Sequence, residues 1–156
     1  MRKSKPKKRI LTPDPKFNDT LVTRFVNNMM WSGKKSVSYN IFYDALDKVQ
    51  AKTQEQGLDV WKKALNNVMP SVEVKARRVG GSTFQIPIEV PAERKIAVGM
   101  KWIISYSRKR SEKSMSDKLA AEIIAASKNE GASVKKREDT HKMADANKAF
   151  SHFKLS

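Results

Sequence analysis

Positively charged side chains are the residues of this sequence whose number and spacing can do chemistry. The 156 residues include 32 Lys and Arg and 16 Asp and Glu, which gives a formal net charge of +16. Residues 1–9 carry six cations and no acid, and residues 71–113 carry ten cations and four acids. Residues 10–70 and 114–156 each carry eight cations and six acids. Because the surplus is concentrated in two segments, it predicts spaced contacts with a polyanion and not merely a solvated surface.

Side chains suited to catalysis or metal binding form no convincing set in the sequence. Cysteine is absent, which excludes disulfides, thiolate metal sites and Cys nucleophiles. His141 and His152 do not have the i, i+4 spacing of a helical metal pair. Residues 33–36 are similar to the end of a phosphate-binding loop, but Asn28 stands where that loop needs its first Gly. We therefore expect no enzymatic activity, no cofactor, no metal and no small-molecule substrate.

The basic N-terminal residues do not have the sequence pattern of a secretory signal peptide. Pro13 and Pro15 follow them where a signal peptide has its apolar segment. No apolar run in the sequence approaches the ~18 residues of a membrane span. We expect a cytoplasmic protein without a membrane partner.

Apolar residues recur with helical spacing in six segments. In the first, Val22, Phe25, Val26 and Met29 lie on one face behind Asp19, which is a suitable N-cap. The six helices are expected to begin near Asp19, Ser36, Leu58, Ala92, Ser114 and Ser133. The last helix is expected to lie on the surface or to depend on a partner, because its apolar stripe is thin. That stripe consists of Met143, Ala146 and Phe150.

Two segments of alternating apolar and polar residues, 72–76 and 84–90, flank Gly80 and Gly81 and predict a β-hairpin. A turn of these two glycines alone would place the apolar residues of one strand opposite the polar residues of the other. A three-residue turn that includes Ser82 pairs the apolar residues with one another, so we expect this longer turn. The expected pairs are Val72 with Val90, Val74 with Ile88 and Ala76 with Ile86. Because a lone hairpin is marginally stable, we expect a projecting arm that settles on its partner.

Together these elements predict a mainly α fold, a bundle of six helices with a two-stranded antiparallel β-hairpin arm between the third and fourth helices. We expect one domain over residues 1–156, in which residues 1–12 are a basic flexible tail and residues 71–91 the projecting hairpin. Trp61 is expected in the core, whereas Trp31 is either a core residue or a residue that stacks on bases.

Three segments carry a resemblance to a known family. Residues 19–45 include Leu21, Phe25, Val26 and then the run GKK at 33–35. Residues 72–90 read VEVKARRVGGSTFQIPIEV, and residues 134–141 read VKKREDTH, with ANKAF following at 146–150. On these motifs the chain resembles, over essentially its whole length, the bacterial small-subunit ribosomal protein seven family. Trp31 and Ser32 depart from the family, which often has charged or polar residues at these positions.

This resemblance implies a fold of six helices with a β-ribbon arm, and a primary rRNA-binding protein that nucleates assembly of the small-subunit head. It further implies a place at the subunit interface, near the exit-site tRNA and the mRNA path. Implied partners are the small-subunit rRNA and the small-subunit ribosomal proteins nine and eleven. The implied location is the small ribosomal subunit in the cytoplasm.

Basic residues are the expected rRNA contacts, because cations that neutralise phosphates release counterions and so make binding strongly salt dependent. Basic patches held at fixed separations by a rigid bundle would recognise a folded RNA by its shape. The candidate contacts are Arg2, Lys3, Lys5, Lys7, Lys8, Arg9, Lys34, Lys35, Lys75, Arg77, Arg78, Arg94, Lys95, Arg108, Lys109 and Arg110. The candidate residues close to tRNA and mRNA are Arg77, Arg78, Val79, Gly80 and Gly81. The alternative is a DNA-binding architectural protein, which the charge permits although the arm has no apolar wedge at its tip.

Overall fold

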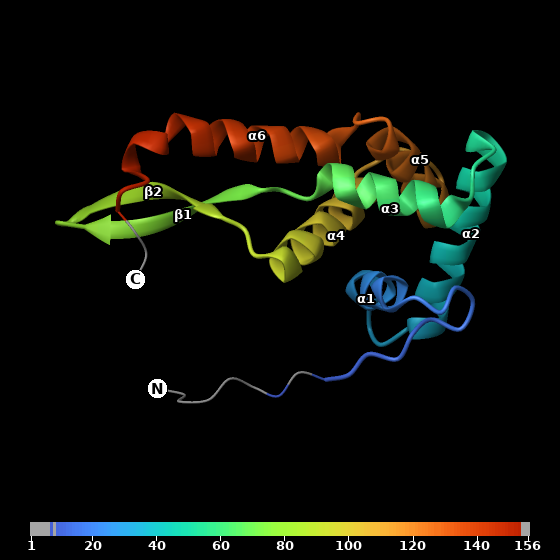
Figure 1. Cartoon of the computed structure of the whole chain (residues 1–156). Helices are drawn as coiled ribbons and strands as arrows, with labels where there is room; N and C mark the ends of the chain where they lie inside the picture. Colours follow the sequence, from blue (N-terminus) through green and yellow to red (C-terminus); the bar gives the residue numbers. More distant parts are fainter. Residues whose placement is uncertain (1–6, 8, 154–156) are drawn as a thin grey trace. The chain divides into compact units, whose positions relative to one another are not determined.

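Six α-helices and one β-hairpin form the part of the chain that the computed structural model describes, residue 7 and residues 9–153 (Figure 1). The elements are α1 Thr20–Met29, α2 Lys35–Thr53, α3 Gly57–Val68, β1 Val72–Val79, β2 Ser82–Glu89, α4 Ala92–Arg108, α5 Met115–Ser127, α6 Ala132–Ala146 and a short 3-10 helix, η1 Lys148–Phe150. The predicted class is confirmed, since the two-stranded antiparallel hairpin lies between α3 and α4. None of the helices in the described residues is long and apolar enough to cross a membrane.

The chain divides into two units, Met1–Asn40 and Ile41–Ser156. These elements do not test whether residues 1–156 form one domain, whether residues 1–12 are a flexible tail, or whether residues 71–91 project. These three statements stay predictions.

Helix starts follow the capping residues that the sequence indicates. The side chain of Asp19 accepts the Leu21 N–H at 2.8 Å, which satisfies a donor at the start of α1. Ser114 accepts the Asp117 N–H at 3.2 Å and donates its hydroxyl to the Asp117 carboxylate at 2.5 Å. The predicted N-cap Asp19 and the predicted helix start near Ser114 are thus confirmed.

In the first unit, the buried face of α1 is formed by Val22, Phe25 and Val26, all fully buried. The Ser38 hydroxyl, in the first turns of α2, donates to the Val26 carbonyl at 2.9 Å. This buried hydrogen bond ties the start of α2 to the end of α1, so the turn between them is held at both ends.

In the second unit, α3 packs against α4 and α5. Trp61 is fully buried, as predicted, and its ring meets the edge of Phe42 with 5.3 Å between the ring centroids. Leu119 and Ile123 of α5 and Met100 of α4 are also fully buried. Burial of large apolar side chains stabilises this unit by roughly 1.5–3 kcal/mol for each one.

The turn of the hairpin is shorter than predicted. Gly80 and Gly81 form a two-residue turn with φ angles of 57° and 87°. The observed cross-strand pairs include Val72 with Glu89, Val74 with Pro87, Lys75 with Ile86 and Arg77 with Phe84. The predicted three-residue turn and its pairing are therefore wrong. Two residues with positive φ suit the tight turn whose twist matches that of antiparallel strands.

The prediction failed because it assumed one apolar face for the whole hairpin. In the observed register Phe84, Ile86 and Ile88 of β2 lie on one face, and Val72, Val74 and Ala76 of β1 lie on the other. The β2 face carries Ile86, which is 1% exposed, and Phe84, whose ring lies 5.2 Å from Phe150 and 5.5 Å from Phe153. Helix α6 and η1 contact the hairpin, and α6 runs alongside it in Figure 1. The arm is thus supported by the C-terminal segment and does not stand alone.

Helix α6 is held by a different set of residues from the predicted apolar stripe. Met143 is 48% exposed, and Phe150 lies beyond the end of the helix, in η1. Val134, Thr140 and Ala144 form the buried side instead. The predicted stripe is wrong because α6 packs through short side chains, which a search for large apolar residues does not detect.

Two side chains cap the C-termini of neighbouring helices. The Asn67 amide donates to the carbonyls of Ala126 at 2.9 Å and Ser127 at 3.2 Å, at the end of α5. Arg137 of α6 donates to the carbonyl of Asn67, in the last turn of α3, and to the side chain of Asn129 at 3.3 Å. These bonds satisfy carbonyls that have no partner within their own helix.

Glu122 is a fully buried carboxylate at the junction of α5, α6 and the α4–α5 connection. Its Oε1 accepts both the N–H of Ser133 at 3.0 Å and the hydroxyl of Ser133 at 2.5 Å. Its Oε2 accepts from the Arg110 guanidinium at 3.0 Å. Because Ser133 lies in the first turn of α6, the carboxylate satisfies a helix donor while the guanidinium balances its charge.

Lys48 joins α2 to the start of α5. Its ammonium lies 2.7 Å from the Asp117 carboxylate, 3.0 Å from the Asp44 carboxylate and 2.9 Å from the Ser116 hydroxyl. Hydrogen bonds from Lys48 and then Ser114 lower the pKa of Asp117 to about 2. A hydrogen bond from Ser116, and then one from the same ammonium, lower the pKa of Asp44.

Acid is expected to weaken the fold through Asp117. An unfolded Asp titrates near ~3.9, so the charged carboxylate stabilises the folded chain above that pH. This contribution is lost as the pH falls from about 4 to about 2, where the folded carboxyl takes up its proton. The urea midpoint of unfolding, measured over this range, should fall more steeply for the unmodified chain than for Asp117→Asn. Parallel curves for the two chains would contradict this role of Asp117.

Candidate nucleic-acid interface

Residues Met1–Asn40 carry half of the net charge in a quarter of the chain. They contain ten basic and two acidic residues, a surplus of eight out of the total of sixteen. Of the predicted tail contacts, Lys7 and Arg9 are exposed. Arg2, Lys3, Lys5 and Lys8 lie outside the described residues. A surplus of this density attracts polyanions over a range set by the salt concentration.

Lys34 and Lys35 are exposed in the turn that leads into α2. The first turn of α2 contains no acidic residue. Cations at this end of a helix oppose its dipole and destabilise it slightly. The Lys35 ammonium lies 5.9 Å from the centre of the Tyr39 ring, a cation–π contact. Helix stability therefore does not explain these two lysines, and their contact with phosphates stays a prediction.

The tip of the hairpin combines cations with an open backbone. Lys75 and Arg78 are exposed and Arg77 is half-buried. Lys75 and Arg77 share the face that carries Ile86 and Phe84, and Arg78 points to the opposite face.

The turn itself leaves room for a ligand backbone. A Cβ atom built on either Gly80 or Gly81 would meet no heavy atom within 4 Å. Val79 is half-buried beside them. With no side chains on the turn, another backbone can approach it closely.

Arg94 and Lys95 begin α4, and Arg94 is bound within the chain. The guanidinium of Arg94 donates to both oxygens of the Glu73 carboxylate, at 2.7 and 2.9 Å. Hydrogen bonding to Glu73 raises the pKa of Arg94 further. The Arg94 side chain still has 58% of its surface exposed, and Lys95 is half-buried. Arg94 can therefore bind a phosphate only while sharing its charge with Glu73.

The three basic residues at the end of α4, residues 108–110, lie in different environments. Lys109 is exposed, with its ammonium 5.1 Å from the centre of the Tyr106 ring, and Arg108 is half-buried. Arg110 binds Glu112 at 3.0 Å and the buried Glu122 at 3.0 Å. The sequence prediction did not anticipate this internal pairing. Arg110 therefore has a structural role that competes with contact to RNA.

A basic groove of about 310 Å³ was not predicted from the sequence. Lys52 of α2, Lys63 of α3 and Lys128 after α5 converge on it, with Glu55 as the acidic residue among its lining. These lysines come from segments with nearly balanced charge, so a count along the chain does not detect them. Only the packing of the three helices brings them together.

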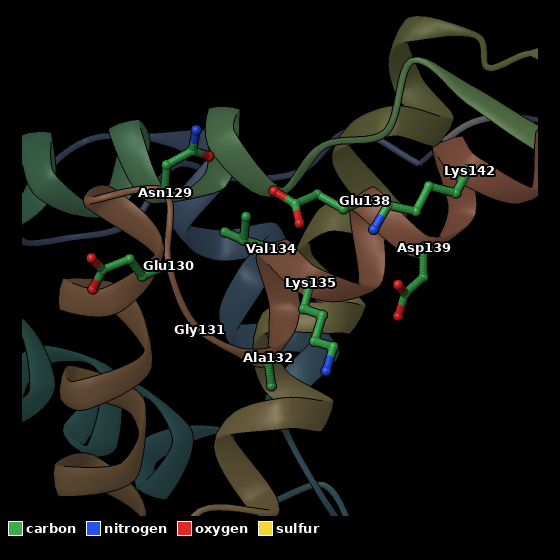
Figure 2. Close-up of a pocket in the computed structure, with 9 residues that line it drawn as sticks. All are labelled: Asn129, Glu130, Gly131, Ala132, Val134, Lys135, Glu138, Asp139 and Lys142. Carbon is green, nitrogen blue, oxygen red and sulfur yellow. The ribbon is translucent and has the colours of Figure 1, made fainter. Parts of the chain in front are cut away.

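A second groove, of about 580 Å³, has mixed charge and lies along α6 (Figure 2). Lys135 and Lys142 line it together with three carboxylates, those of Glu130, Glu138 and Asp139. Carboxylates at this density repel a phosphate backbone. Among the described residues, no group of three or more His, Asp or Glu side chains is arranged to hold a metal ion.

Comparison with known proteins finds relatives over almost the whole chain. A family model described as ribosomal protein S7p/S5e matches residues 1–148. The chain is 69% identical over 155 residues to the small ribosomal subunit protein uS7 of Cytophaga hutchinsonii, covering 99% of this chain and 100% of the relative. Proteins of the same name from Flavobacterium psychrophilum and Gemmatimonas aurantiaca are 65% and 56% identical, over 99% and 94% of this chain and 100% and 94% of theirs.

Proposed function

We propose that this chain, which belongs to the ribosomal protein S7p/S5e family, is a primary rRNA-binding protein that nucleates assembly of the subunit head. As a member of this family it is a structural constituent of the small ribosomal subunit and not an enzyme. It works in the cytoplasmic ribosome, with rRNA and other ribosomal proteins as its partners. We propose both its first binding partner and its place in the subunit.

The observation that supports this proposal is the concentration of cations in the N-terminal unit and on the hairpin. The N-terminal unit holds half of the surplus charge, and the hairpin adds the exposed Lys75 and Arg78. Each phosphate neutralised contributes a slope of about −0.7 to −0.9 to the dependence of log affinity on log salt. Cations held on folded elements favour an RNA whose backbones can meet several of them at once, which is recognition by shape.

The hairpin tip is the part of the chain that we assign to the exit-site tRNA and the mRNA path, at the subunit interface. The open turn of Gly80 and Gly81 lets a nucleic-acid backbone approach, and Arg77 and Arg78 adjoin it. Small-subunit ribosomal proteins nine and eleven are the neighbours in this proposal. The mixed charge along α6 suits a protein neighbour better than RNA.

Replacing Arg77 and Arg78 with Ala is expected to weaken RNA binding at the arm while the free protein unfolds at nearly the same temperature. Arg78 is exposed, and Arg77 is half-buried at the end of the hairpin. The salt slope of RNA affinity should fall by about 0.7–0.9 for each phosphate that is no longer neutralised. Lys135→Ala with Lys142→Ala, which changes the charge equally in the mixed groove, serves as the control. A large decrease in the thermal stability of the free Arg77, Arg78 variant would show that these arginines are structural.

Binding to protein-free rRNA tests the primary role. The full chain is mixed with small-subunit rRNA alone and sedimented at moderate salt. We expect it to remain on the RNA at one copy per molecule and to improve the later binding of other head proteins. Retention only after another ribosomal protein has bound would contradict primary binding.

A further inference from the structure

Trp31 is a large aromatic side chain with no place in a core. It is 70% exposed, whereas Trp61 is fully buried. Five large apolar side chains are exposed among the described residues, and four of them belong to Met1–Asn40. These four are Ile10, Leu11, Trp31 and Val37. Exposed large apolar side chains are therefore concentrated in this unit, and Trp31 is the largest of them.

The turn that carries Trp31 holds its backbone in a fixed conformation. The Lys34 N–H donates to the Trp31 carbonyl at 3.0 Å and closes a four-residue turn. Its two central residues, Ser32 and Gly33, have positive φ angles of 52° and 72°. A Cβ built on Gly33 would meet nothing within 4 Å, so the approach to the turn is open. The backbone that carries the indole is thus held in a defined conformation, which lowers the backbone entropy lost on binding.

The charged residues next to Trp31 indicate which kind of molecule would bind there. Lys34 and Lys35 follow it within four residues and are exposed, and the first turn of α2 has no acid. An aromatic ring combined with nearby cations is how proteins hold unpaired nucleotides, since the ring stacks on a base while the cations meet the phosphates. A base within a duplex has both faces covered, so an unpaired base is required.

We propose that the indole of Trp31 stacks on an unpaired base of the small-subunit rRNA, with Lys34 and Lys35 on the adjacent phosphates. This rests on the proposed rRNA binding and adds to it a residue that senses a base as well as the backbone.

The test is the affinity of the full chain for small-subunit rRNA at several salt concentrations. Trp31→Ala should raise Kd by about 5- to 150-fold, the effect of removing one base–aromatic stack. Its salt slope should stay unchanged, because the same phosphates remain neutralised. Lys34→Ala with Lys35→Ala should lower the slope by about 0.7–0.9 for each lysine that meets a phosphate. Trp31→Phe should recover part of the affinity, and the free variants should unfold like the unmodified chain.

Fluorescence gives a second readout that a structural role would not move. The emission of Trp31, obtained as the difference between the unmodified chain and Trp31→Phe, should be quenched when rRNA binds. The buried Trp61 should contribute no such change.

The remaining outcomes separate this inference from the proposed function. Unchanged rRNA affinity for Trp31→Ala, with weaker binding of the lysine variant, would overturn stacking and leave rRNA binding intact. Weaker binding of Trp31→Ala to a neighbouring ribosomal protein, at unchanged rRNA affinity, would overturn it in favour of a protein interface. Equal binding of rRNA and duplex DNA by the unmodified chain would instead refute the proposed function itself.

Discussion

Glu122→Ala is expected to destabilise the folded protein by about 2–5 kcal/mol, mainly because two buried hydrogen-bond donors lose their acceptor. The change leaves the Ser133 N–H and hydroxyl without their acceptor and takes the second carboxylate from Arg110. It also removes the link between α5 and the first turn of α6. Because α6 packs on the hairpin, we expect the arm to lose protection from hydrogen exchange together with α6.

Urea denaturation of matched variants measures this destabilisation. Glu122→Gln keeps a carbonyl oxygen for the Ser133 N–H but not the charge for Arg110, so it should be destabilised by an intermediate amount. Glu130→Ala removes an exposed carboxylate at the same end of α5 and should change stability by less than about 0.5 kcal/mol. If Glu122→Ala were as stable as Glu130→Ala, the buried carboxylate would not hold this junction together.

Deletion of residues 2–9 is expected to cause the largest decrease in RNA affinity. These residues carry six cations and no acid, and only Lys7 and Arg9 among them fall within the described residues. If four to six of the cations meet phosphates, Kd should rise by about 10²- to 10³-fold at ~0.15 M salt, and the salt slope should fall by about 3–5. Filter binding to small-subunit rRNA over a range of salt concentrations measures both.

A scrambled tail is the matched control for this deletion. It keeps all six cations and changes only their order, so it should bind nearly as well as the unmodified chain if the tail acts through its charge. A scrambled tail as weak as the deletion would show that specific contacts, and not charge, carry its effect.

Local signals explain why much of the helical fold could be predicted. A cap such as Asp19 or the pair Ser114 and Asp117 acts within three residues, so its bonds can be read from neighbouring positions. The burial of Trp61 follows from its place on an apolar helix face.

Features that depend on distant partners could not be predicted in the same way. The hairpin register places Phe84 on the face that Phe150 contacts, and the sequence pattern does not show which element covers Phe84. Glu122 and Ser133 are eleven residues apart and meet only because α5 and α6 pack together. For the same reason the groove formed by Lys52, Lys63 and Lys128 was missed. Of the predicted RNA contacts, Arg94 and Arg110 have carboxylate partners within the chain.

The most direct test of rRNA recognition by spaced cations compares two polyanions at equal moderate salt. The affinity of the full chain is measured for a multi-helix junction of small-subunit rRNA and for duplex DNA of the same number of phosphates. Recognition by shape predicts that the junction binds about tenfold more tightly or better, because only its backbones meet the basic patches together. Equal affinity for both would show that the net charge of +16 acts as a bulk property and would contradict specific binding to rRNA.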